Sequence, residues 1–168
     1  MSLLTLDLGD VDAAKPYRAA AATSALVIRV IGYSYAATFS LWCFFLVFSL
    51  SGRAGLGALL LIAFLVVPLL AVFFVFLCAG RIEVASLGWS VAALVWFAAP
   101  IPHFLALVPY YGVLIAGGLT RGTLLPVAII GIVFEVSLRT IGLVFAIKAV
   151  RACLAIRRLG RGSEARIF

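Results

Sequence analysis

Two ionisable residues, Glu135 and Arg139, lie inside a long apolar run near the C-terminal end of the sequence. At a spacing of four residues they share one face of a helix, where they can form an ion pair. If the run crosses a bilayer, Glu135 lies near its centre, where a charged side chain costs about 2.5–3.5 kcal/mol on insertion scales. We therefore expect this face to look inward, onto other helices of the chain or onto a partner.

A buried charged pair has two interpretations. As a functional element it would relay protons or ions, or anchor a polar substrate. As a structural element it would fix helix packing while its two charges neutralise each other. Glu135 is the only acidic residue at membrane depth, whereas proton pathways use chains of such groups. We expect the structural role and keep the transport role as the alternative.

His103 is the only histidine, and it follows Pro100 and Pro102 within another apolar segment. A break in a membrane helix frees backbone groups and is tolerated where it is buried or lines a cavity. His103 is therefore a candidate pocket residue, proton carrier or cofactor ligand. One histidine cannot supply bis-histidine haem ligation, and we expect His103 near the non-cytoplasmic surface, bonded to backbone or headgroup.

The sequence contains no recognisable catalytic motif. Phosphate-binding, zinc-protease and serine-hydrolase signatures are all missing. The three cysteines have no C-x-x-C spacing and no neighbouring histidine, which favours small apolar residues over metal ligands; they are Cys43, Cys78 and Cys153. We expect no metal, no cofactor and no enzymatic activity.

The elements that position these residues follow from composition. The chain has 168 residues, of which 66% are hydrophobic and 11% are charged, with a mean hydropathy of +1.29. Soluble domains are nearer half apolar and a quarter charged. The net charge of +7 is concentrated beside apolar runs, where basic residues set orientation and meet anionic lipid rather than nucleic acid. The sequence predicts one all-α membrane domain.

Four transmembrane helices are predicted. A lead-in over 1–25, where Pro16 suits the start of an interfacial helix, precedes the first span. A turn at 80–83 is expected after the second span, and a basic cytoplasmic tail over 151–168 continues the last helix until Gly160 and Gly162 end it. The spans cover about 26–50, 56–79, 87–117 and 124–150.

The third segment is ambiguous. Its 31 residues would reach about 46 Å as a straight helix, against a hydrocarbon core of about 30 Å. Its prolines break it near Pro100 and Pro102, so it crosses either once as a broken helix or twice as two short ones. A single crossing puts ten basic residues on one side and two on the other, with Arg139 inside the membrane; two crossings give five against seven. The positive-inside rule favours one crossing, with both termini cytoplasmic in a plasma or inner membrane.

Two further sets of residues are predicted to make contacts. Small residues at helix interfaces let backbones approach closely; those expected to form packing faces are Gly32, Ala36, Ser40, Gly131 and Gly142. Basic residues near the cytoplasmic ends of the spans are expected to contact lipid headgroups; they are Arg29, Lys148, Arg151, Arg157 and Arg158.

These features predict a non-enzymatic membrane subunit that packs against a partner membrane protein or against copies of itself, in contact with lipid and without nucleic acid. One alternative is a small oligomeric transporter or channel whose path is lined by the Glu135–Arg139 face. The other is a membrane enzyme or cofactor-binding subunit that uses His103.

Overall fold

The computed structural model describes residues 8–50, 56–99 and 125–164, with side chains for residues 12–40, 69–99, 126 and 129–159. This part of the chain is entirely helical apart from one short turn. Its four helices are α1 (Leu8–Leu50), α2 (Leu56–Glu83), α3 (Leu87–Ala98) and α5 (Leu125–Glu164). The predicted all-α class is confirmed for the described residues.

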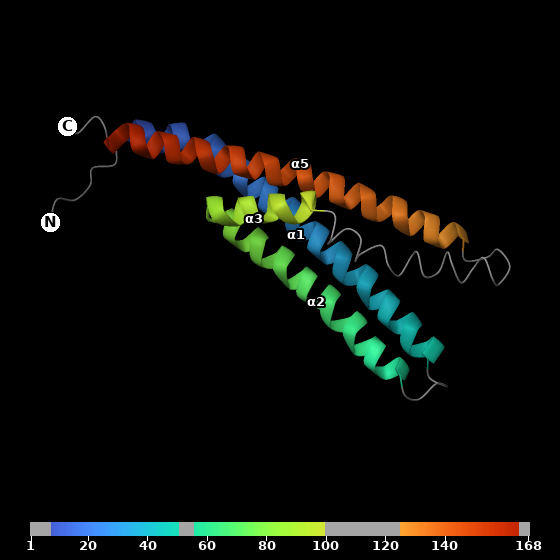
Figure 1. Cartoon of the computed structure of the whole chain (residues 1–168). Coiled ribbons are helices and arrows are strands. Elements are labelled where there is room, and N and C mark those ends of the chain that lie inside the picture. The colour runs from blue at the N-terminus through green and yellow to red at the C-terminus, as the bar shows by residue number, and fades with distance from the viewer. Residues whose placement is uncertain (1–7, 51–55, 100–124, 165–168) are drawn as a thin grey trace.

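The four helices pack in a closed cycle. Helix α1 contacts α2 and α5, and α3 closes the cycle by contacting both α5 and α2. The start of α1 lies beside the end of α5, so these two long helices run antiparallel (Figure 1). Because α3 has 12 residues, the described residues form a four-helix cross-section along its length alone.

The hydrophobic core occupies this four-helix section. Each helix contributes residues that are almost fully buried, and most of them are small, which allows the helices to approach closely. They include Ala25 and Ile28 in α1, Ala79 and Ile82 in α2, Ala93 and Phe97 in α3, and Ala146 and Ala149 in α5.

Two segments, Asp12–Ser40 and Ile129–Leu159, are long and apolar enough to cross a membrane. Their outer faces expose large apolar side chains, including Leu26 and Val30 on α1 and Ile130 and Val133 on α5. Among the described side chains, eight Ser and Thr hydroxyls donate to the carbonyl four residues earlier. Such back-bonding satisfies a hydroxyl where lipid offers no partner.

The predicted turn at 80–83 is wrong, because α2 continues to Glu83. Ile82 is fully buried in the core, so burial holds this last turn in the helix. The helix ends instead in two capping bonds, from the Ala85 amide to the Ile82 carbonyl at 2.8 Å and from the Ser86 amide to the Arg81 carbonyl at 3.1 Å. This is a Schellman motif, and it places Ala85 at φ 57°, the left-handed conformation that glycine usually occupies.

Both long helices extend further than their sequence patterns predict. Helix α1 begins at Leu8 and contains Pro16, so the predicted lead-in and the predicted first span form one continuous helix. Helix α5 runs through Gly160 and Gly162 to Glu164. The two extensions lie at the same end of the molecule (Figure 1), and paired helices tolerate residues of low helix propensity better than an isolated helix does.

Candidate functional site

Glu135 is the buried acidic residue at the centre of the candidate site. Its side chain on α5 is only 5% exposed. The Tyr35 hydroxyl on α1 donates a hydrogen bond to its Oε1 atom at 3.1 Å. A buried carboxylate needs such a donor, because an unsatisfied one would lose its hydration without compensation. The bond therefore connects α1 to α5.

Arg139 lies one turn further along α5 and faces a different helix. Its guanidinium donates to the Trp96 carbonyl at 3.4 Å and to the Ala99 carbonyl. Helix α3 ends at Ala98, and Ala99 adopts an extended conformation, so these carbonyls belong to a helix end. The last carbonyls of a helix have no partner within it, and a cation there also meets the negative end of the helix dipole. Arg139 thus caps α3 just before Pro100.

The two residues that the sequence pairs with each other therefore each hydrogen-bond to a different helix. Among the described side chains, the ion pair with nitrogen and oxygen within 4.0 Å is that of Arg29 and Glu83, at 2.6 Å. Glu135 and Arg139 still share one face of α5, so each charge lies near the other. The carbonyls at the end of α3 compete for the guanidinium, and spacing within α5 carries no information about them.

Sequence reasoning missed Tyr35. The available signal was its position three residues after Gly32, on the same face of α1. A phenol there can reach a polar group on a helix packed against that face. Together, Tyr35, Glu135 and Arg139 connect α1, α3 and α5 near the C-terminal end of α3.

The glycines predicted for packing make contacts of unequal closeness. A Cβ atom added at Gly142 would lie 2.5 Å from the buried Phe97 ring, and one added at Gly32 would lie 3.3 Å from Phe76 and Val75. Gly131 is buried as well.

Gly32, Ala36 and Ser40 follow one another at a spacing of four residues and form a predicted packing ladder on α1, of which the last two residues are less enclosed. Ala36 is half-buried and Ser40 is exposed, and the Ser40 hydroxyl bonds back to the Ala36 carbonyl. Within this chain, only Gly32 of that ladder lies at a tight helix contact.

His103 and its neighbouring prolines lie outside the described residues, so its proposed pocket or ligand role stays a prediction. Within the described part of the chain, no group of three or more His, Cys, Asp or Glu side chains is placed to hold a metal ion. Cys78 and Cys153 are free and buried. The Cys153 Sγ lies 3.3 Å from the Ser90 Oγ, which joins α5 to α3.

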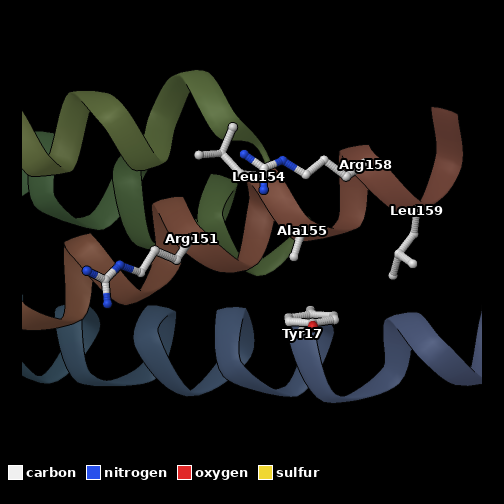
Figure 2. A pocket seen from close by; sticks show the side chains of 6 residues that line it. All are labelled: Tyr17, Arg151, Leu154, Ala155, Arg158 and Leu159. Carbon is white, nitrogen blue, oxygen red and sulfur yellow. The ribbon is translucent and has the colours of Figure 1, made fainter. Parts of the chain in front are cut away.

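The five residues predicted to contact lipid headgroups have different surroundings in the structure. Arg29 pairs with Glu83, and the Lys148 ammonium lies 4.7 Å from the centre of the Phe145 ring. Arg151 and Arg158 line a groove between α5 and α1 (Figure 2), whereas Arg157 is exposed and does not line it. Contact with headgroups stays a prediction for all five.

No protein-family model matches the sequence, and the searches of curated proteins and of solved structures found no significant match.

Proposed function

We propose that this protein is a non-enzymatic integral membrane subunit that crosses the bilayer four times, with both termini cytoplasmic, and packs against a partner membrane protein or against copies of itself. The observation that carries the proposal is the use of the buried polar groups. Tyr35 bonds to Glu135, and Arg139 caps α3. Both contacts join helices, as expected of groups that stabilise a scaffold.

The arrangement of the helices supports an even number of crossings. The start of α1 and the end of α5 lie at one end of the molecule (Figure 1), and these two stretches carry many of its basic residues. A basic end of this kind faces the cytoplasm under the positive-inside rule. Helix α3 is too short to span a bilayer by itself at about 18 Å, so the third crossing would need residues beyond Pro100.

Labelling tests the topology. Single cysteines would replace Arg121 and Ser163 in a chain lacking its own cysteines, and an impermeant thiol reagent would be added to intact cells. We expect labelling of the cysteine at 121 from outside, and labelling at 163 only after the membrane is opened. Labelling of both positions from the same side would contradict four crossings.

The outer apolar faces are where a partner would bind. Ile130 on α5 is 68% exposed and Leu70 on α2 is 61% exposed. A photo-crosslinking amino acid at either position should capture a protein in native membranes, and gentle extraction should yield an assembly heavier than 17.8 kDa. The same amino acid at Arg157, which is exposed on α5 beyond the apolar run, is the control and should capture less. Purely lipid adducts together with a monomeric extract would refute the subunit proposal.

One observation favours transport as a second candidate. The Glu135 carboxylate is buried and, among the described side chains, has a phenol rather than a cation as its hydrogen-bond partner. A carboxyl group in this setting can bind and release a proton. Proteoliposomes with an internal pH dye separate the two functions: a transporter would move protons and lose that flux in Glu135→Gln, whereas a scaffold would show no flux in either form.

A further inference from the structure

A groove opens between the two long helices at the end of the molecule where α1 begins and α5 finishes. Its volume is about 480 Å³, and it is lined by Tyr17 of α1 and by Arg151, Leu154, Ala155, Arg158 and Leu159 of α5. Figure 2 shows the Tyr17 ring lying between the two helices beneath Ala155. Tyr17 is 41% exposed and Leu154 is 39% exposed, so the groove is open to its surroundings.

The chemistry of the lining combines positive charge with apolar surface. Among the described side chains, the charged residues that line the groove are both arginines, and none of the lining residues is acidic. Arg151 and Arg158 are seven residues apart, or about 10.5 Å along the helix axis. In Figure 2 the Arg158 side chain runs back along α5 towards Leu154, and the Arg151 side chain runs in the same direction along the helix. The Tyr17 hydroxyl adds a neutral donor, and the two leucines add apolar walls.

The position of the groove along α5 matches a membrane interface. The apolar run of α5 ends at Val150, and the first groove residue follows directly. The headgroup layer extends about 5–8 Å beyond the hydrocarbon core on each side. Arg151 therefore lies at the level of the lipid phosphates. Arg158 lies further out along α5, and its side chain runs back towards Leu154 (Figure 2).

We infer that this groove binds the headgroup of an anionic phospholipid. A guanidinium forms paired hydrogen bonds with phosphate oxygens, and basic pockets between membrane helices on the cytoplasmic side suit anionic headgroups. Leu154, Leu159 and the Tyr17 ring lie further from the hydrocarbon core than Arg151, so they can pack on the carbon atoms of the headgroup beyond its phosphate. A free phosphate would match the arginines but would leave these apolar walls unused.

The other basic residues nearby differ in their surroundings. Arg29 pairs with Glu83, and Lys148 lies over the Phe145 ring. Arg157 is exposed on α5 beside Arg158, yet it does not line the groove. Arg157 is therefore a matched control, because its removal takes away the same charge at almost the same depth. The inference requires that α5 cross the bilayer and does not require a partner protein.

The test measures lipid retained by the full-length protein. Protein from vesicles of phosphatidylcholine containing a minor fraction of phosphatidylglycerol would be released into detergent, and bound lipids counted by native mass spectrometry. Because a basic residue near the surface contributes about 1 kcal/mol, equal to about fivefold in affinity, we expect about fivefold less retained phosphatidylglycerol for Arg158→Gln and about thirtyfold less when Arg151→Gln is added. Arg157→Gln should retain as much as the unaltered protein. Helical content measured by circular dichroism checks that each variant folds.

Three results would overturn the inference. Equal losses in Arg157→Gln and Arg158→Gln would indicate diffuse surface charge without a site. Unchanged retention in the double variant would place the lipid elsewhere. Displacement of the lipid by inorganic phosphate at matched ionic strength, with no effect from chloride, would make the groove a free-phosphate site. If Arg151→Gln fails to fold, the comparison of Arg158→Gln with Arg157→Gln still decides.

Discussion

Two regions of this protein each contain a glutamate and an arginine, but the glutamate is exposed in one region and buried in the other. At one, Arg29 and Glu83 join α1 to α2 through a 2.6 Å ion pair whose side chains are 36% and 53% exposed. At the other, Glu135 is 5% exposed and accepts a longer bond of 3.1 Å from Tyr35, beside an arginine that caps α3. The shorter contact contributes less to folding stability, because exposed ion pairs contribute about 0.2–1 kcal/mol. A buried polar group that is left unpaired costs about 1–3 kcal/mol or more.

Arg139→Met should have the largest effect, because it removes the cap of α3 and also the cation nearest to Glu135. We expect the free energy of unfolding, measured by denaturant titration in mixed micelles, to fall by about 3–5 kcal/mol, because two hydrogen bonds from a charged donor are lost and each contributes about 1.5–3 kcal/mol. The matched Arg29→Met should cost about 1 kcal/mol or less. Equal losses in the two variants would remove the distinction between the regions.

The double variant Glu135→Leu with Arg139→Leu sharpens this comparison. If the two residues formed a self-contained pair, removing both would recover most of the loss in the single variants. In the structure their partners are Tyr35 and the end of α3, and both would remain unpaired. We therefore expect only partial recovery in the same titration; complete recovery would indicate direct pairing.

Tyr35→Phe keeps the aromatic ring and deletes the donor to Glu135. We expect a loss of about 1.5–3 kcal/mol, the range for hydrogen bonds to charged groups. Tyr33 is the natural control, since it lies two residues away and is 61% exposed, with its ring packed on Phe76 at 4.9 Å between centroids. Tyr33→Phe should therefore be close to neutral in the same unfolding measurement. A Tyr35→Phe variant as stable as the unaltered protein would mean that Glu135 reaches water.

Gly142→Ala probes packing in the buried region without altering any charge. The new Cβ would come within 2.5 Å of the Phe97 ring, and that ring is only 2% exposed and cannot move freely. Overpacking of this kind typically costs about 1–3 kcal/mol. At Gly80 nothing lies within 4 Å of an added Cβ, so Gly80→Ala should be neutral or stabilising through helix propensity. Thermal unfolding of the two variants should shift in opposite directions or differ clearly in size.

The smallest effect is expected at the exposed pair. Glu83→Gln should lower the free energy of unfolding by about 0.2–1 kcal/mol, and added salt should shrink the difference because exposed charges are screened. The titration would be run in detergent at low and high ionic strength. A loss of stability that does not change with salt would show that lipid or detergent shields this pair from solvent ions. The pair would then resemble the buried site around Glu135.

Several features of the fold were accessible from residue patterns because they depend on local chemistry. The apolar runs predict long helices, and the structure contains them. The spacing of Glu135 and Arg139 places both on one face of α5 because a helix turns every 3.6 residues. The residue pattern did not predict where α2 ends. Gly80 is typical of a helix C-terminus, yet the burial of Ile82 keeps the next turn helical, and Ala85 occupies the left-handed capping position. The candidate partner of Glu135 was missed for a similar reason, since Tyr35 is 100 residues away in the sequence.

The sequence by itself determined that the chain is helical, that its helices are apolar enough for lipid, and that a carboxylate and a guanidinium lie deep within one of them. These properties follow from composition and periodicity, which act over one or two helical turns. The tertiary structure decided which groups those charges meet. Arg139 can hydrogen-bond to the carbonyls of Trp96 and Ala99 only because α3 ends beside it, and a helix end offers unpaired acceptors that no spacing within α5 encodes.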